Sequence, residues 1–229
     1  MTRALRRAAA RAGLALLLTT LANAPLTAQA LVGVRGGWSS TTVRMRYGNP
    51  LWRHSGTVGG WARLPLTADW SIQVEGQAVR RGFDLGPPDE GLLWTGYEFP
   101  VLIKRFLSRR ASDAAYITVG AVPAQQRSCV YSTTDPLDFP TRVREFDCDL
   151  YHNPDSLTSE AWEWGALLGV GTELSWGALR LTLDARTVVG LTRLVEFTAL
   201  TSGRGQRAVV YPARSIAGQL LVGVAYPPG

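Results

Sequence analysis

Residues 70–83, WSIQVEGQAVRRGF, alternate between apolar and polar side chains over most of their length. Trp70, Ile72 and Val74 fall on one side of the chain, and Gln73 and Glu75 fall on the other. A period of two residues predicts a β-strand with two unlike faces. In a soluble protein the apolar face points into a core, whereas in a membrane barrel it meets lipid and the polar face lines the interior. The rest of the chain has to decide between these arrangements.

Residues 1–30 have the pattern of a secretory signal peptide. Four arginines precede a short apolar run at 13–21, and Ala28-Gln29-Ala30 places small residues at a cleavage site. The apolar run is too short to cross a bilayer core of about 30 Å as a helix. We therefore expect a mature chain of residues 31–229 that forms one domain. The formal charge of +6 falls to +2 without these four arginines, so we predict no nucleic-acid partner.

Eight segments of the mature chain are predicted to be strands, and their connections alternate between short turns and long polar loops. The strands cover about residues 31–40, 57–64, 70–81, 92–106, 114–122, 162–174, 179–191 and 215–226. The longest connection is the third long loop, residues 123–161. An even strand number with short turns at one end is typical of outer-membrane barrels. We predict an all-β fold, an eight-stranded antiparallel up-and-down transmembrane β-barrel with both termini periplasmic, in a Gram-negative-type bacterium.

The polar strand faces carry equal numbers of acidic and basic residues. They are Arg35, Glu75, Glu98, Lys104, Glu173, Arg180, Asp184 and Arg186. A charge that faced lipid at the bilayer midplane would cost about 2–4 kcal/mol. We therefore expect these side chains to pair inside a polar barrel filled by side chains. A soluble sandwich with one solvated face is the alternative.

Aromatic residues near the strand ends predict two interfacial belts. The set near the short turns comprises Trp70, Phe106, Tyr116, Trp176 and Tyr226, and the set near the long loops comprises Trp94 and Trp164. Packing in a core is the other interpretation of these residues.

Eight arginines lie at strand ends or in loops on the predicted outer side, at the level of lipopolysaccharide phosphates. They are Arg44, Arg46, Arg53, Arg80, Arg81, Arg193, Arg207 and Arg214. Because a guanidinium binds phosphate through two bonds, some of them are candidates to hold lipid. A solvated rim in an arginine-rich chain is the alternative.

Cys129 and Cys148 lie in the exported part of the chain, where two cysteines usually pair. We predict a disulfide that ties the third outer loop. A metal site would need CxxC spacing or nearby histidine pairs, which the sequence lacks. No metal or other cofactor is predicted.

Six segments together resemble the PorT-like family of small outer-membrane β-barrel proteins. In order they are LVGVRGGWSS, WSIQVEGQAVRRGF, YEFPVLIKRF, YITVGAV, LLGVGTELSWGALRLTLDARTVVGLTRL and LLVGVAY. The resemblance spans nearly all of the mature chain and implies an eight-stranded barrel without implying an enzyme. The chain departs from such barrels at its end, because Tyr226 lies three residues before the terminus and no aromatic residue is last.

The leading functional hypothesis is a non-enzymatic integral outer-membrane protein whose barrel anchors the long outer loops for binding or envelope integrity. Its expected partners are outer-membrane lipid, lipopolysaccharide and, during insertion, the outer-membrane assembly machinery; the sequence does not identify a protein partner of the loops. One alternative is a barrel enzyme that acts on lipid A or phospholipid. Its candidate groups are His54, His152, Ser55, Ser156, Asp149 and Asp155. Another alternative is an exported soluble lipocalin-like carrier with an apolar lumen.

Overall fold

The computed structural model describes residues 30–44, 50–84, 91–109, 113–134, 143–147, 157–159, 162–192, 195–200 and 208–227. The secondary structure of these residues consists of strands. Their bounds are β1 (Leu31–Arg44), β2 (Leu51–Pro65), β3 (Trp70–Asp84), β4 (Gly91–Glu98), β5 (Val101–Arg109), β6 (Asp113–Thr134), β7 (Val143–Asp147), β8 (Leu157–Ser159), β9 (Trp162–Trp176), β10 (Leu179–Gly190), β11 (Val195–Leu200) and β12 (Ala208–Tyr226). Among the described residues, no helix is long and apolar enough to cross a membrane.

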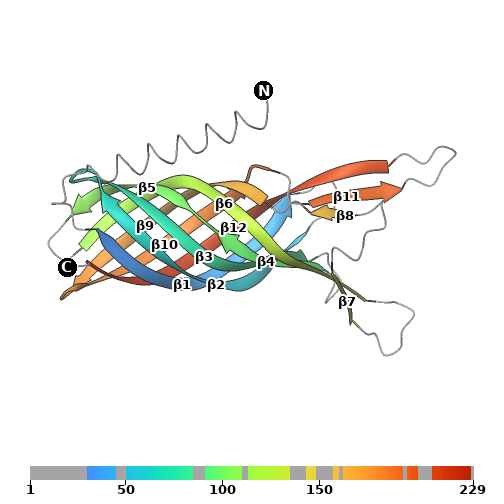
Figure 1. The fold of residues 1–229 in the computed structure, drawn as a ribbon, viewed down its shortest axis with the longest axis horizontal. Coiled ribbons are helices and arrows are strands. Elements are labelled where there is room, and N and C mark those ends of the chain that lie inside the picture. Colours follow the sequence, from blue (N-terminus) through green and yellow to red (C-terminus); the bar gives the residue numbers. More distant parts are fainter. Residues whose placement is uncertain are drawn as a thin grey trace, which may run out of the picture.

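The strands close into a ring (Figure 1). Neighbours pair antiparallel in the order β1, β2, β3, β4, β6, β9, β10 and β12, and β12 pairs back onto β1 to complete the wall. β5 continues the position of β4 between β3 and β6, so these two strands together form one of the eight members of the ring. The predicted eight-stranded antiparallel up-and-down barrel is confirmed.

The fourth wall strand is interrupted at Phe99 and Pro100. Proline has no N–H to donate to the ladder, so the regular pairing stops there. The wall nevertheless stays joined, because the Glu75 N–H donates to the Pro100 carbonyl (2.9 Å) and the Phe99 N–H donates to the Pro123 carbonyl (2.8 Å).

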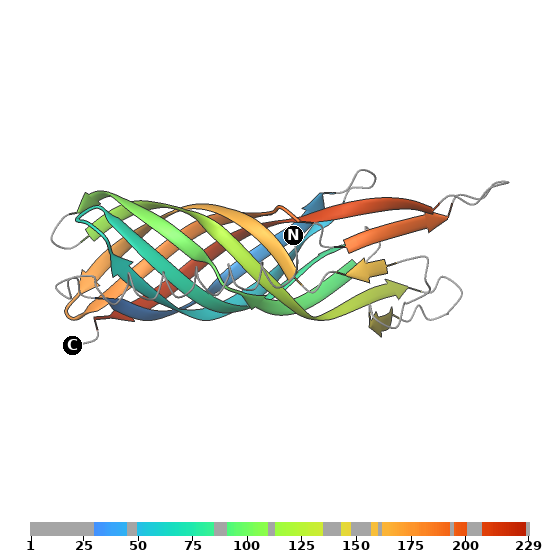
Figure 2. The same cartoon turned by 45° about the horizontal axis from the view of Figure 1, so that its top comes forward.

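One end of the barrel, termed the turn end, carries the short β2–β3, β5–β6 and β9–β10 connections and the end of β12. At the β9–β10 turn, Gly177 has φ +60°, a conformation that two-residue hairpin turns favour in glycine. The opposite end is termed the loop end. Strands β7, β8 and β11 lie beyond it (Figures 1 and 2).

The strands extend further toward the loop end than the sequence predicted. Residues 123–134 were expected to be loop, but β6 continues through them and pairs with β7 at Val130 and Asp147. β8 and β11 likewise pair within predicted connections, at 157–159 and 195–200. Polar strand ends satisfy their backbone groups by pairing with each other, which hydrophobic alternation alone does not reveal.

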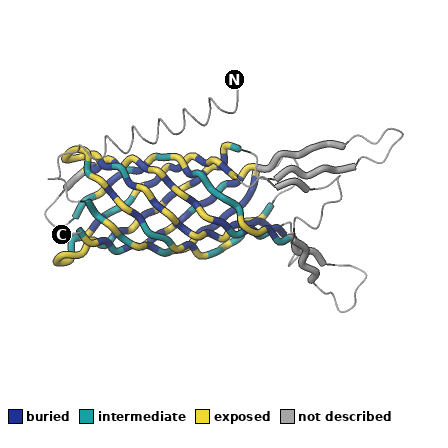
Figure 3. Tube along the Cα trace, viewed as in Figure 1, coloured by how far each residue is buried: buried dark blue, intermediate teal, exposed yellow. Residues whose placement is uncertain are grey.

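Over much of the wall, buried residues alternate with exposed or half-buried ones (Figure 3). The exposed positions hold large apolar residues such as Val74, Val101 and Leu183, whereas the buried positions include Gln73 and Lys104. This arrangement is the reverse of a soluble core and is the one that a bilayer requires. The alternating strand at residues 70–83 therefore turns its apolar face outward, and a soluble sandwich does not describe this wall.

Glycines on the inner faces make room for large interior side chains. A Cβ on Gly171 would lie 2.5 Å from the Tyr116 ring, and one on Gly33 would lie 2.7 Å from the Trp61 ring. Both rings therefore occupy space that only a missing side chain leaves open.

The prediction of two interfacial aromatic belts is partly wrong. Trp70, Trp176, Tyr226 and Trp164 are exposed on the wall, in agreement with interfacial positions. The expectation is wrong for Phe106, Tyr116 and Trp94, which are buried. Each stands at an inward position of its strand, and the Phe106 and Tyr116 rings meet edge to face with centroids 5.6 Å apart.

Candidate functional site: the charged interior of the barrel

Ten charged side chains are buried within the described wall, five of them basic and five acidic. The basic residues are Arg35, Arg63, Arg81, Lys104 and Arg186, and the acidic residues are Glu75, Glu98, Glu163, Glu173 and Asp184. Because an unpaired buried charge is costly, the arrangement of these groups governs whether the interior is stable.

Arg35, Glu75, Lys104, Asp184 and Arg186 form one group of charges, termed the middle layer. Glu75 lies at its centre. Arg186 binds it through two parallel hydrogen bonds, from Nη1 to Oε2 (2.8 Å) and from Nη2 to Oε1 (3.0 Å). Arg35 forms an ion pair with Oε1 at 3.1 Å, and the Gln73 amide donates to the same oxygen at 2.5 Å. Two guanidinium groups from β1 and β10 thus converge on one carboxylate from β3, across the lumen.

Asp184 is the second acid of this layer. It receives a hydrogen bond from the Tyr116 hydroxyl (2.8 Å) and forms ion pairs with Arg186 (3.3 Å) and Arg35 (3.6 Å). The Lys104 ammonium lies 4.0 Å from the same carboxylate and 3.9 Å from the centroid of the Tyr116 ring. A ring face attracts a cation, so Lys104 is stabilised by both an acid and an aromatic surface.

Near the turn end, Arg63 on β2 forms an ion pair and a hydrogen bond with Glu173 on β9. Its guanidinium also lies 5.3 Å from the Phe106 ring centroid and 5.8 Å from that of Trp61. Phe106, which was expected in the interface, therefore helps to hold an interior arginine together with Trp61.

Toward the loop end, Arg81 on β3 forms an ion pair with Glu98 on β4, and the Gln77 amide donates to Glu98 at 2.9 Å. The Ser215 hydroxyl on β12 donates to Glu163 on β9. The first contacts join β3 to β4, and the last joins β12 to β9.

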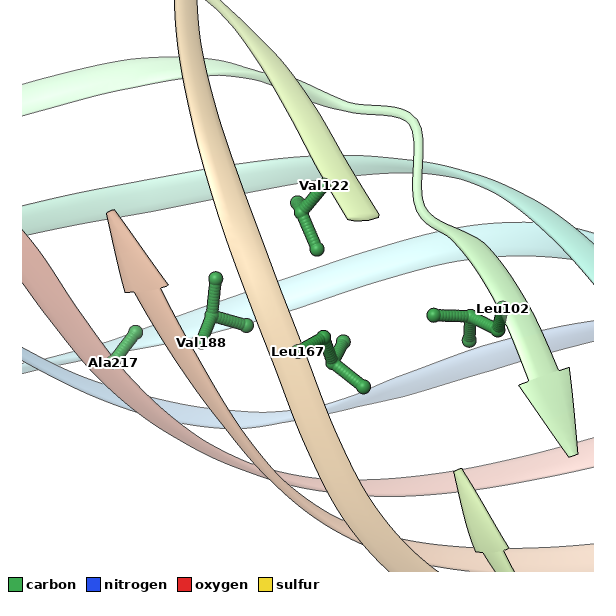
Figure 4. Close-up of a cluster of buried hydrophobic side chains, with 5 residues drawn as sticks. All are labelled: Leu102, Val122, Leu167, Val188 and Ala217. Carbon is green, nitrogen blue, oxygen red and sulfur yellow. The ribbon is translucent and has the colours of Figure 1, made fainter. Parts of the chain in front are cut away.

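An apolar cluster separates the middle charges from those near the loop end. It consists of Leu102, Val122, Leu167, Val188 and Ala217, whose side chains gather inside the ring (Figure 4). Leu102 is two residues from Lys104 on β5, and Leu167 is four residues from Glu163 on β9, so the cluster lies between the two groups of charges. Among the described residues, no group of three or more His, Cys, Asp or Glu side chains could hold a metal ion.

We expect this interior to block steady ionic current. An eight-stranded barrel is just wide enough to be filled by side chains, and here ion pairs and an apolar cluster follow one another along the lumen. Planar bilayers that contain the purified monomer should show no stable open level above the bare-bilayer background. A large and lasting conductance from the wild-type monomer would contradict the packing described here.

Of the eight predicted interior charges, seven are buried in the ring and one is not. Arg180 is exposed, and its assignment to the interior is corrected: it follows the Gly177–Ala178 turn closely and stands at the open mouth of the turn end. Three interior charges were missed. The sequence predicts no role for Arg63 or Glu163, and the position predicted for Arg81 is the outer rim.

The placement of Arg81 at a lipopolysaccharide-facing rim is wrong because β3 keeps its alternation as far as Arg81 and the strand itself runs on to Asp84. The inward series of Gln73, Glu75 and Gln77 therefore continues to residue 81, and this continuation was the signal that could have found it. Arg80, its neighbour, points outward and is exposed.

The other predicted rim arginines lie in several settings. Arg44 and Arg214 are exposed at paired positions of β1 and β12, and Arg53 is half-buried with an ion pair to Asp84 (3.3 Å). Arg46, Arg193 and Arg207 lie outside the described residues. Cys129 is buried on β6, but Cys148 also lies outside them, so the disulfide stays a prediction. The signal peptide stays a prediction for the same reason.

A closed antiparallel ring with an apolar exterior and a paired, charged interior defines a transmembrane β-barrel. Solved structures similar to this chain include Neisserial surface protein A, with 10% identity, a TM-score of 0.46 and coverage of 86% of this chain and 97% of the other. The outer-membrane protease OmpT from Escherichia coli is similar with 9% identity, a TM-score of 0.48 and coverage of 86% and 96%. The attachment invasion locus protein Ail of Yersinia pestis follows with 11% identity, a TM-score of 0.41 and coverage of 86% and 98%.

No protein-family model matches the chain, and no curated protein matches it. The PorT-like resemblance therefore stays a prediction.

Proposed function

We propose that the protein is a non-enzymatic integral membrane protein of the outer membrane of a Gram-negative-type bacterium. Its barrel anchors the segments at the loop end for binding or for envelope integrity, and both termini face the periplasm. The observation that carries the proposal is the reversal of the wall, whose described residues are apolar outside and include five buried acids and five buried bases inside. Such a wall is stable in lipid and has no wide lumen to serve as a diffusion pore.

The partners follow from the same wall. Its exterior is bathed in outer-membrane lipid, and its exposed loop-end arginines suit the phosphates of lipopolysaccharide. The outer-membrane assembly machinery inserts it, and the order of its quoted segments supports membership of the PorT-like family.

An enzyme acting on lipid A or phospholipid is less well supported. His54 is exposed, and its ring stacks on Trp38 with centroids 4.9 Å apart. The hydroxyl of the adjacent Ser55 donates to the Arg80 carbonyl at 2.5 Å and not to this histidine. His152, Ser156, Asp149 and Asp155 lie outside the described residues. A soluble lipocalin-like carrier would need an apolar lumen, which the charged interior opposes.

Fractionation and gel migration test the proposal. We expect the chain in outer-membrane fractions, released only by detergent, and a change in its gel mobility after boiling, because a closed barrel resists unfolding in cold detergent. Protease added to intact cells should cut within the loop-end segments and leave the wall intact. Recovery from a detergent-free soluble fraction, with equal migration before and after boiling, would contradict the proposal.

A further inference from the structure

A groove of about 440 Å³ lies on the outer surface of the wall, over adjoining parts of β2, β3, β4 and β6. The small residues Gly56 and Ala78 form its floor, and the larger residues Val58 and Tyr97 lie beside them. All four are exposed. The volume falls within the range of about 300–1,000 Å³ that small-molecule sites occupy. On a wall that faces lipid, a mostly apolar groove of this kind admits an acyl chain.

A β-bulge on β6 shapes one side of the groove. Thr95 on β4 pairs with Ser128, but the next residue, Gly96, pairs with Gln126, so Arg127 is one residue in excess. The bulge breaks the alternation, because Arg127 and Ser128 are both exposed and Cys129 is buried again. Bulges often redirect a side chain. Here the bulge turns Arg127 outward, beside the groove.

A second irregularity lies across the groove on β2. Trp52 pairs with Phe83, while Thr57 pairs with Val79, so β2 also contains one extra residue between these positions. Gly56 lies in this stretch and forms part of the groove lining. The two irregular strands flank β3 and β4, which explains why the wall is hollowed here.

Two arginines, Arg80 and Arg127, line the groove on its loop-end side. Along β3, exposed Val74, Gly76 and Ala78 give way to Arg80 at the next outward position. Arg127 also lines the groove, with its guanidinium 5.5 Å from the Tyr97 ring centroid. None of the described lining residues is acidic, so the groove offers two positive charges at its polar end.

We propose that the groove binds a phosphate-bearing lipid of the outer leaflet, with one acyl chain along Ala78 and its phosphate between Arg80 and Arg127. This inference rests on the proposed outer-membrane location and names the lipid site of that wall. Lipid tails are as apolar as the wall, so the chain gains packing and not hydrophobic transfer. The arginines therefore select the headgroup, and the groove orders the chain attached to it.

The test uses the full chain in phosphatidylcholine bilayers that contain diphosphorylated lipid A as a minor component, with lipid A retained per barrel counted by native mass spectrometry. The double variant Arg80→Gln, Arg127→Gln should retain about fivefold less lipid A, because two phosphate contacts are lost. Ala78→Phe should cause a comparable loss while both arginines remain. Lipid A without phosphates should not be retained by the wild type.

Matched controls are available on the same wall. Arg105→Gln removes an exposed arginine at the turn end, and Val170→Phe places the same aromatic side chain at an exposed position on β9; both should retain lipid A at the wild-type level. Gel mobility before and after boiling checks that each variant folds, and Ala78→Leu replaces Ala78→Phe if the latter does not. Undiminished lipid A in either the arginine or the Ala78 variant overturns the groove, as does its displacement by millimolar inorganic phosphate alone. A folded, membrane-bound barrel with that result leaves the proposed function standing, whereas a soluble chain overturns both.

Discussion

Replacing Glu75 by alanine should lower the free energy of unfolding by about 3–5 kcal/mol, the usual cost of removing one partner of a buried ion pair. The loss is large because Arg35 and Arg186 both contact this carboxylate, and both are buried. Asp184 remains within ion-pair distance of each, but one carboxylate then faces three cations, counting Lys104. Glu75→Gln should lose less, since it keeps the volume and one hydrogen-bond acceptor.

Urea unfolding of the barrel in lipid vesicles, followed by tryptophan fluorescence, measures this effect. Asp69→Ala is the control, because Asp69 is an exposed acid at the β2–β3 turn. Equal stability of the Glu75→Ala and Asp69→Ala variants would mean that the middle layer contributes nothing beyond filling space.

Leu167→Ala should cost about 2–5 kcal/mol, whereas the same change at the next residue, Leu168, should cost less by about 1–3 kcal/mol. Leu167 is 4% exposed inside the apolar cluster, and Leu168 is 63% exposed on the outer wall. Truncation inside leaves a cavity among Leu102, Val122 and Val188 that neighbours refill only in part. Truncation outside leaves space that lipid chains occupy.

The same vesicle unfolding assay compares the two variants, which differ in one position and share one chemistry. The critical result is which of the two variants loses more free energy of unfolding. If Leu168→Ala were the more destabilised, the inner and outer faces of β9 would have to be exchanged, and with them the assignment of every alternating residue on that strand.

Much of the interior could be predicted from alternation. Once Glu75 faces inward, so do Gln73 and Gln77, and the same logic places Asp184 and Arg186 on one face of β10. The errors arose where an element's end was misjudged. Arg81 is the last residue of the strand predicted for 70–81 and so is predicted at the rim, but β3 runs on to Asp84; Arg180 has inward parity on β10, but it is exposed close to the turn.

Pairing within the interior could not be predicted, because it depends on strand register and on ring closure. Arg63 and Glu173 are 110 positions apart and meet only when β2 and β9 face each other across the lumen. The groove on the outer surface of the wall could not be predicted from the sequence either. A bulge adds one residue to an otherwise regular strand, and the sequence around Arg127 carries no signal that marks which residue is in excess.

The equality of buried acids and bases has a consequence for how the protein responds to membrane voltage. A transmembrane potential acts on net charge, at about 2.3 kcal/mol per elementary charge per 100 mV. Among the described residues, the five buried cations and five buried anions sum to zero when all are ionised, so a uniform field exerts no net force along the axis on this set of charges. It can only reorient individual pairs, and these are held by bonds between different wall strands, several of them across the lumen. The packed interior is thus suited to stay in place whatever the polarity of the membrane.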